Sequence, residues 1–237
     1  MPGNFPGSAV SSKLNLLALD TSTEACSAAL LCADGQVFAE FEIAPRQHTK
    51  LLPKMMDAVL GSARCAKSAI SHCAFANGPG AFTGVRIAAS MAQGIGIALQ
   101  IPLIPVSTLA ILAQASFDRY HGESTLVALD ARMNEVYWAV YRRDENSLAS
   151  LVGFESLNKI EDVSFDVPIS HGAGHGWLVG QHIWQARQSV AIDSGLLPNS
   201  EALLKLAVPT LNCGQVYTAD KISINYLRNQ VAKKPRE

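Results

Sequence analysis

The pattern of apolar and polar positions contains one unit twice. An apolar run at 16–19 leads to Asp20 and a polar turn, and a second apolar run follows; the same order recurs around Asp130 after the run at 126–129. This arrangement predicts two β-hairpins, at 14–31 and 125–142, each with a carboxylate at its tip. Two such tips that face each other across a cleft can grip a phosphate chain, but a duplicated scaffold would show the same pattern.

Helices and further strands are predicted around these hairpins. The Asp34-Gly35 turn leads into a third strand at 36–43, which completes an antiparallel meander. Helical spacing of apolar residues predicts helices at 48–62 and 83–99, and Pro53 then belongs in a first turn. The remaining predictions are strands at 69–76 and 167–170, helices at 108–117 and from Trp177, a glycine turn at 171–176, and a tail at 201–231 with a helix and a returning segment.

The predicted elements group into two lobes. A chain of 237 residues can bury a substantial core, and two prolines at 102 and 105 mark the crossing between the lobes. We expect a flexible leader at 1–13, a first lobe at 14–104 completed by roughly 218–237, and a second lobe at 105–217.

Composition changes this picture in two ways. The chain has 19 Lys and Arg against 20 Asp and Glu, which argues against avid binding of nucleic acid by this chain alone, so RNA would require a partner. Five cysteines, without a CxxC spacing, are typical of a reduced compartment. With no signal sequence and no uncharged apolar stretch long enough to span a bilayer, we expect a cytoplasmic protein with no membrane contact.

The segment 77–86 is a candidate anion site. Gly78, Gly80, Gly84 and the candidate cap Thr83 stand at the mouth of the predicted helix 83–99, where free N–H groups and the helix dipole favour phosphate or carboxylate. The pattern is neither a P-loop nor a dinucleotide fingerprint. A tight strand-to-helix turn would require the same glycines, so both interpretations remain open.

The hairpin tips differ in their polar residues. Asp20 with Thr21 and Ser22 could position a magnesium-bound phosphate, or Asp20 could close a local turn with its own side chain. The turn after Asp130, at 131–133, has neither glycine nor hydroxyl groups to receive a phosphate. Only the first tip therefore has the side chains of a phosphate site.

The helix at 83–99 has a stripe of small residues, Gly84, Ala88, Ala92 and Gly96, at every fourth position. Residues four apart share a helix face, so another backbone can approach closely along this stripe. The stripe either packs on the protein's own sheet or forms a protein interface. Glycine inside a helix costs about 1 kcal/mol relative to alanine, so close packing is needed to offset it.

Histidine and nucleophile patterns give no catalytic site. His48 begins the helix at 48–62, but the residue four later is Leu52, so that helix has no metal-binding histidine pair. His171 and His175 have the right spacing but flank glycines in a turn. No GxSxG elbow is present. We therefore expect neither a catalytic residue nor a metal site.

Several motifs together resemble the TsaB (YeaZ) family. They are LALDTST at 17–23, HTKLLP at 48–53, NGPGAFTGVRI at 77–87, VALDAR at 127–132 and YLR at 226–228, and the resemblance covers nearly the whole chain from about residue 14. It implies an α/β protein of the actin-like ATPase (ASKHA) fold, with two lobes built on RNase H-like mixed sheets. The two hairpins would then be the two phosphate motifs of that fold.

The resemblance also implies a function. Proteins of this family are non-catalytic partners of the related subunit TsaD in forming threonylcarbamoyladenosine (t6A) at adenosine 37 of tRNAs that read ANN codons. By the same resemblance, the ATPase TsaE would bind the TsaB–TsaD pair, the chain would form a homodimer without TsaD, and tRNA would be bound only through the complex. TsaD carries a metal-binding histidine pair on the helix where this chain has Leu52, which agrees with a non-catalytic role.

Two sets of residues follow from this interpretation. A vestigial or weak nucleotide site would comprise Asp20, Thr21, Ser22, Gly78, Gly80, Thr83 and Gly84, and weak binding of ATP or ADP with Mg²⁺ is allowed at or near the partner surface. The partner surface itself would comprise Leu52, Met55, Met56, Gly84, Ala88, Ala92 and Gly96. Two alternative functions are a nucleotide-dependent, kinase-like enzyme of the same superfamily and an M22-type, glycoprotease-like peptidase.

Overall fold

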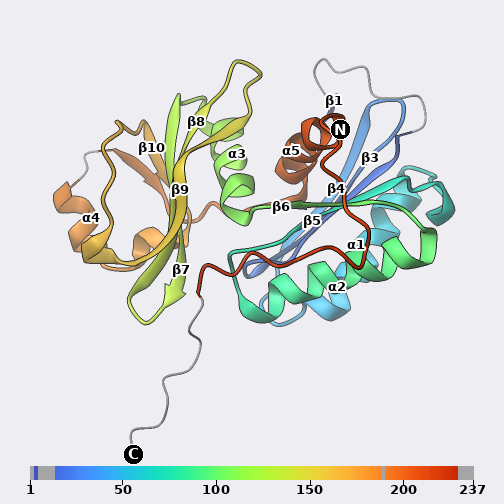
Figure 1. Cartoon of the computed structure of the whole chain (residues 1–237), viewed down its shortest axis with the longest axis horizontal. Coiled ribbons are helices and arrows are strands. Elements are labelled where there is room, and N and C mark those ends of the chain that lie inside the picture. The colour runs from blue at the N-terminus through green and yellow to red at the C-terminus, as the bar shows by residue number, and fades with distance from the viewer. Residues whose placement is uncertain (1–2, 5–13, 188–189, 229–237) are drawn as a thin grey trace, which may run out of the picture.

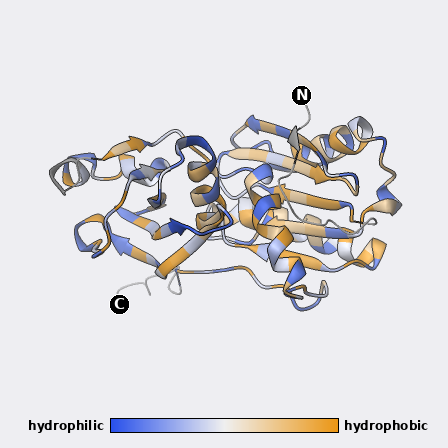
Figure 2. Ribbon diagram, turned by 90° about the horizontal axis from the view of Figure 1, so that it is seen from above, coloured by the Kyte–Doolittle hydropathy of each residue, from blue (hydrophilic) through white to orange (hydrophobic). Residues whose placement is uncertain are grey.

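The computed structural model describes residues 3–4, 14–187 and 190–228, and the protein has two lobes side by side (Figure 1). Most of the expected leader at 1–13 and the end of the tail at 229–237 lie outside the described residues. Each lobe is built on one mixed β-sheet. Hydrophobic residues follow the strands of both sheets (Figure 2).

The first sheet has the strand order β1-β4-β3-β2-β5-β6. Strands β2, β3 and β4 form the expected antiparallel meander, whereas β5 and β6 run parallel to β2. The two-residue strand β1 pairs with β4 at the edge. The strands are β1 (Gly3–Asn4), β2 (Leu16–Asp20), β3 (Ala25–Leu31), β4 (Gln36–Ile43), β5 (His72–Ala76) and β6 (Leu103–Val106).

The second sheet repeats this order as β9-β8-β7-β10-β11. Strands β7, β8 and β9 are antiparallel, and β10 and β11 run parallel to β7. The strands are β7 (Ser124–Arg132), β8 (Glu135–Arg143), β9 (Ala149–Lys159), β10 (His171–Ala173) and β11 (Ala191–Asp193). The duplication seen in the hairpins therefore extends to the whole sheet, and the expected actin-like arrangement of two RNase H-like mixed sheets is confirmed.

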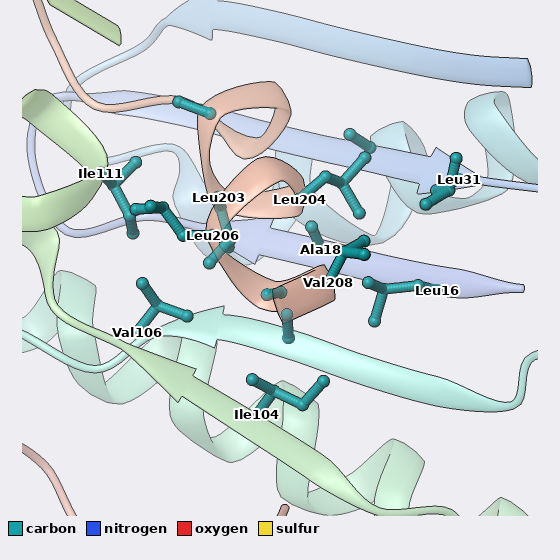
Figure 3. Close-up of a cluster of buried hydrophobic side chains, with 14 of the residues drawn as sticks. Leu16, Ala18, Leu31, Ile104, Val106, Ile111, Leu203, Leu204, Leu206 and Val208 are labelled. Atoms are coloured by element: carbon teal, nitrogen blue, oxygen red, sulfur yellow. The ribbon is translucent and has the colours of Figure 1, made fainter. Parts of the chain in front are cut away.

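Helices fill the spaces on both sides of each sheet. Helices α1 (His48–Ser62) and α2 (Phe82–Leu99) cover one face of the first sheet, and α5 (Ser200–Asn212) covers the other, where Val208 and Leu204 share a buried cluster with Leu16 and Ala18 (Figure 3). Helix α3 (Thr108–Tyr120) lies between α5 and the second sheet. The far face of that sheet is covered by the 3₁₀ helix η3 (His175–Leu178) and by α4 (Gln181–Arg187). Two more 3₁₀ turns are η1 (Lys67–Ala69) and η2 (Ile160–Asp162).

The described part of the tail joins the lobes. After α5 the chain pairs with β6 at Leu103 and Tyr217, and it then runs along α2 towards the second lobe (red segment in Figure 1). Side chains of this segment, among them Ile222 and Ile224, pack against the core under α1 and α2. We call residues 215–228 the strap.

Several sequence predictions require correction. The second lobe does not extend to 217, because α5 packs its apolar face on the first sheet. The strand predicted at 167–170 lies at 171–173, inside the expected glycine turn. Gly172 is part of this strand because a Cβ atom there would lie 2.3 Å from the Trp177 ring, so the glycine does not mark a turn. Strand β9 was not predicted, since a partly exposed edge strand lacks a continuous apolar pattern. Pro53 is the sixth residue of α1 and so lies beyond its first turn.

Helix α2 is the one described helix that is long and apolar enough, by length and composition, to cross a membrane. A helix that packs on the core of a soluble protein passes the same test. One face of α2 packs on the first sheet, so its apolar character has a structural use in this fold.

Candidate functional site

The tip of the first hairpin is buried. Asp20, Thr21 and Ser22 are at most 2% exposed. The Oδ1 atom of Asp20 accepts hydrogen bonds from the backbone N–H and the hydroxyl of Ser22, at 2.7 and 2.6 Å. This is the local turn that the sequence offered as the alternative to a phosphate site. Among the described residues, Asp20 Oδ2 has no hydrogen-bond partner.

Burial governs the chemistry of Asp20. It raises the pKa of the carboxyl group, while the two hydrogen bonds from Ser22 and the nearby His48 act to lower it. Through the two hydrogen bonds to its Oδ1 atom, Asp20 has a structural role in the turn.

The glycine loop closes on this tip. Ala81 N donates to Ser22 O at 2.8 Å, and the hydroxyl of Thr21 donates to Gly84 O at 2.7 Å. A Cβ atom on Gly84 would lie 2.0 Å from Thr21 O, and one on Gly80 would lie 2.4 Å from Ser22 O. These glycines allow α2 to approach the hairpin tip, which is the strand-to-helix interpretation of the motif.

The residues at this tip do not fit the phosphate chain of a nucleotide. The carbonyl oxygens of Thr21 and Ser22 face the loop that would have to hold the phosphates, and carbonyl oxygens repel anions. Gly78 lies against Asn225 O of the strap. Thr83 does not cap α2, because the helix begins at Phe82 and its N-cap is Ala81.

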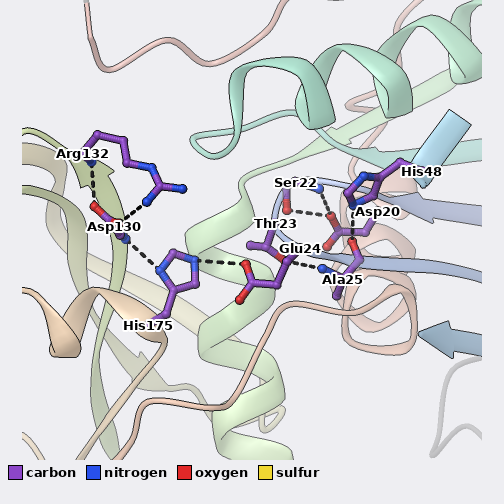
Figure 4. Close-up of polar contacts among 9 residues, drawn as sticks. All are labelled: Asp20, Ser22, Thr23, Glu24, Ala25, His48, Asp130, Arg132 and His175. Carbon is purple, nitrogen blue, oxygen red and sulfur yellow. Dashed lines mark hydrogen bonds and ion pairs between the residues drawn. The ribbon is translucent and has the colours of Figure 1, made fainter. Parts of the chain in front are cut away.

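The second tip is held differently (Figure 4). Asp130 accepts a hydrogen bond from Arg132 N at 2.7 Å and forms a 3.0 Å ion pair with the Arg132 guanidinium. Asp130 N donates to His175 Nδ1 at 3.0 Å, and His175 Nε2 lies 3.7 Å from the Glu24 carboxylate of the first hairpin. The two tips thus meet through Glu24 and His175, two residues that the sequence did not single out for this contact.

The histidines do not form a metal site within the part of the chain that the structure describes. His48 Nε2 lies 3.2 Å from Ala25 O, and Leu52 is buried in the core below it. His171 contacts Ser116 whereas His175 contacts Asp130, so the two side chains have different partners. The described residues contain no group of three or more His, Cys, Asp and Glu side chains that could hold a metal ion.

Comparison with known proteins identifies the family. Residues 41–174 match the family described as TsaD: tRNA N6-adenosine threonylcarbamoyltransferase. The tRNA threonylcarbamoyladenosine biosynthesis protein TsaB of Escherichia coli K12 is 38% identical, over 93% of this chain and 97% of that protein. TsaB of Haemophilus influenzae is 34% identical, over 93% and 96%. The chain belongs to the TsaB family.

A solved structure supports this assignment. YeaZ from Pseudomonas aeruginosa has a TM-score of 0.83 and 40% sequence identity, covering 90% of this chain and all of that chain. A second crystal structure, of a protein described as similar to peptidase YeaZ, has a TM-score of 0.84 and 41% identity, covering 91% of this chain and all of that one. Membership of the TsaB family supports a role in t6A biosynthesis.

A serine and a histidine contact each other inside the second lobe, as a peptidase nucleophile and its base would. Ser116 Oγ lies 2.6 Å from His171 Nε2, which is the contact of a serine–histidine pair. However, Ser116 is fully buried and His171 is 5% exposed, and Ser116 also contacts Thr125 inside the second lobe. No peptide can reach this hydroxyl in the folded protein, so the pair has a structural role.

The predicted partner surface has to be corrected. Gly84, Ala88, Ala92 and Gly96 are buried, and Gly96 packs against the side chain of Leu103 in the first sheet. Leu52 and Met55 of α1 are buried in the same core, and only Met56 is partly exposed. The small-residue stripe therefore packs on the protein's own sheet, because α2 must approach β5 and β6 closely.

Helix α2 also has an exposed apolar face, opposite the buried stripe, which the sequence analysis did not identify. Ser90, Gly94, Ile97 and Ala98 are exposed there, and Ile97 retains 70% of its full accessibility. Ile87, Met91 and Ile95 are partly exposed beside them. Arg86 is the one charged residue of α2. This lack of charged residues could have predicted the exposed apolar face from the sequence, since a helix that is apolar all round has to be covered on more than one side.

Proposed function

We propose that this TsaB-family protein is a non-catalytic subunit that pairs with TsaD and supports the threonylcarbamoylation of adenosine 37 in tRNAs that read ANN codons. We place the chain in the cytoplasm. There it would bind TsaE through the TsaB–TsaD pair and form a homodimer when TsaD is absent. The observation that carries this proposal is the exposed apolar face of α2 on a chain whose homologues are named for t6A biosynthesis.

The chemistry of that face suits a helix-on-helix interface. Its residues are small or aliphatic, so a partner helix can approach closely and bury Ile97 without leaving a charge unpaired. An exposed apolar strip of this kind is typical of a protein interaction site. Burial of one Ile side chain contributes on the order of 2 kcal/mol, so this residue alone can change partner affinity strongly.

Two observations favour the non-catalytic assignment over a kinase-like enzyme. The carbonyl oxygens of Thr21 and Ser22 close the first tip, and Asp130 is paired with Arg132 at the second. A phosphate chain would meet carbonyl oxygens at the first tip and a carboxylate that is already paired at the second, so neither tip is arranged for phosphoryl transfer. We infer that any nucleotide used in the reaction is held elsewhere in the complex, at or near the partner surface.

The test is a charge on the exposed face of α2. We expect Ile97→Glu to retain the fold, because the side chain is mostly in solvent, and to lower affinity for TsaD by about tenfold or more by placing a charge in the interface. Mass-resolved chromatography of the chain, alone and mixed with TsaD, measures assembly. The t6A content of tRNA from cells that carry the variant measures function.

A matched control is available on the other lobe. Phe154 lies on β9 and is 85% exposed, so Phe154→Glu makes the same kind of change away from α2. This variant should assemble and support t6A formation as the original chain does. Normal assembly of the Ile97→Glu variant with TsaD would show that the interface lies elsewhere. Ala92, which belongs to the partner surface predicted from the sequence, is unsuitable for this test, since a charge there would disrupt the core.

A further inference from the structure

A stack of aromatic and guanidinium groups lies at the junction of the two lobes. The Arg86 guanidinium carbon is 3.3 Å from the centre of the Phe82 ring and 5.1 Å from the centre of the Tyr226 ring. Phe82 and Arg86 belong to the first turns of α2, whereas Tyr226 belongs to the strap. Both rings are large and exposed, at 60% for Phe82 and 46% for Tyr226.

The strap holds Tyr226 in place although its ring is exposed. On one side, Asn225 N donates to Asn77 O at 2.8 Å in the first lobe, and Asn225 Nδ2 donates to Glu155 Oε2 at 2.9 Å in the second. On the other side, Arg228 donates to Ala131 O at 3.0 Å and forms an ion pair with Glu135. A ring fixed in this way loses little conformational entropy when it binds a ligand.

The charge on Arg86 is available to a ligand. Arg132 and Arg228 are each paired with a carboxylate, Asp130 and Glu135. In the described parts of the chain, no carboxylate lies within ion-pair distance of Arg86, and its Nη1 donates a 2.8 Å hydrogen bond to Phe82 O. Its remaining N–H groups can therefore bind an anion while the guanidinium stays over the Phe82 ring.

Aromatic rings beside an arginine are the features by which proteins hold unpaired bases of RNA. Each base can stack on an exposed ring or on a guanidinium plane, and the adjacent phosphate pairs with the cation. Protein hot spots also contain tyrosine and arginine, but a protein partner would have to supply a carboxylate for Arg86, whereas an RNA strand carries a phosphate at every nucleotide. The RNA interpretation needs no further feature.

We propose that Phe82, Arg86 and Tyr226 form a stacking contact for an unpaired nucleotide of the tRNA bound by the TsaD-containing complex. This inference rests on the proposed function, which supplies the RNA. One free arginine gives a weak contact, in agreement with the nearly neutral charge of the chain. The contact adds to RNA affinity within the assembly and does not make the isolated chain an avid RNA-binding protein.

The test compares ring removal with ring retention. Tyr226→Ala should weaken binding of unmodified tRNA by the assembled complex about fivefold or more, because loss of one stacked base costs about 1–3 kcal/mol. Tyr226→Phe retains the ring and should bind as the original complex does. Phe154→Ala removes an exposed ring of β9 that is not part of the stack and serves as the control. Fluorescence anisotropy with labelled tRNA at one fixed salt concentration measures each affinity.

A second variant tests the charge. Arg86→Gln should lower the slope of log affinity against log salt by about 0.7, the value expected for one phosphate contact on a single strand. Unchanged tRNA affinity in Tyr226→Ala, or an equal loss in Phe154→Ala, would overturn the proposal. It would also be overturned if Tyr226→Ala weakened assembly with TsaD in chromatography and left tRNA affinity intact, because the stack would then be a protein contact.

Failure of the proposed function gives a different result. If the chain does not assemble with TsaD, the RNA contact is tested on the chain alone, by photo-crosslinking to a single-stranded oligonucleotide that carries 4-thiouridine. Crosslinking that maps to Tyr226 and disappears in Tyr226→Ala would support the stack while the proposed function fails. If assembly and t6A formation are normal but neither crosslink nor affinity depends on Tyr226, only the RNA contact is wrong.

Discussion

The two hairpin tips end equivalent strand pairs, yet one is buried and the other is exposed. Asp20 is 2% exposed beneath α2, whereas the Asp130 side chain is 25% exposed and Met133, in the turn after it, is 70% exposed. Both carboxylates accept a hydrogen bond from the backbone N–H two residues later. The duplication has therefore retained the turn at each tip and changed what covers it.

This difference shows that the repeated strand order is a shared scaffold and that its two hairpin tips have separate structural roles. At the first tip, the backbone of α2 lies against the carbonyl oxygens of the hairpin, so the tip belongs to the core of the first lobe. At the second tip, Arg132, Met133 and Asn134 all have positive φ angles and project from the sheet beside Arg228 of the strap. A conserved strand order does not carry a conserved binding site with it.

The largest expected effect comes from opening the first tip. Gly84→Ala places a Cβ atom 2.0 Å from a backbone oxygen that cannot move without distorting the hairpin, so we expect a loss of about 3 kcal/mol in the free energy of unfolding. Gly94→Ala makes the same change on the same helix where the added Cβ atom meets open space, and it should raise stability by about 0.5–1 kcal/mol.

Urea denaturation of both variants, at one protein concentration, measures these two changes. If Gly84→Ala were as stable as Gly94→Ala, the first tip would have space for a side chain at position 84. The contrast between a closed first tip and an exposed second tip would then be wrong. A loss confined to Gly84→Ala would agree with a sealed tip.

An intermediate effect is expected at the second tip. Met133 has a φ angle of 58°, which an unbranched side chain adopts at a cost and which asparagine tolerates well. Met133→Asn should therefore raise the free energy of unfolding by about 0.5–1 kcal/mol. Met133→Gln removes the exposed apolar group but is no better suited to this angle, and it should give no gain. Thermal unfolding of the two variants distinguishes relief of strain from loss of an exposed apolar group.

The sequence predicted the shared scaffold because that scaffold depends on local patterns. Strand β4 and helix α1 lie at the predicted bounds, and α2 begins one residue early, since alternation and helical spacing report burial directly. The lobe to which α5 belongs depends on packing between residues far apart in the chain, such as Val208 and Leu16, and no local pattern contains that information.

The site was harder to predict for a related reason. The stripe at Gly84, Ala88, Ala92 and Gly96 correctly indicated close approach of another backbone, but spacing cannot say whether that backbone belongs to the same chain. The glycine loop gave the same ambiguity, which the contact between Gly84 and Thr21 O decides. The stack of Phe82, Arg86 and Tyr226 joins segments at opposite ends of the sequence, so only the fold brings it together.

The smallest effect concerns the contact between the tips and depends on pH. Burial lowers the pKa of His175, and the carboxylates of Glu24 and Asp130 act in the opposite direction, while Arg132 lowers it further. His175 Nδ1 accepts the Asp130 N–H, so protonation of the ring removes that bond. The folded state therefore binds the proton less readily than the unfolded state does, and His175 should reduce stability as the pH falls below the unfolded pKa of about 6.5.

His175→Gln should remove this contribution, since the Gln carbonyl can still accept the Asp130 N–H but does not titrate. Glu24→Gln should enlarge it, because loss of the Glu24 charge lowers the pKa of His175 further. The measurement is the difference in unfolding free energy between each variant and the original chain, followed from pH 7.5 to 5, where other histidines contribute equally and cancel. Equal pH dependence in Glu24→Gln and the original chain would mean that Glu24 and His175 do not interact, and the two tips would then be independent of each other.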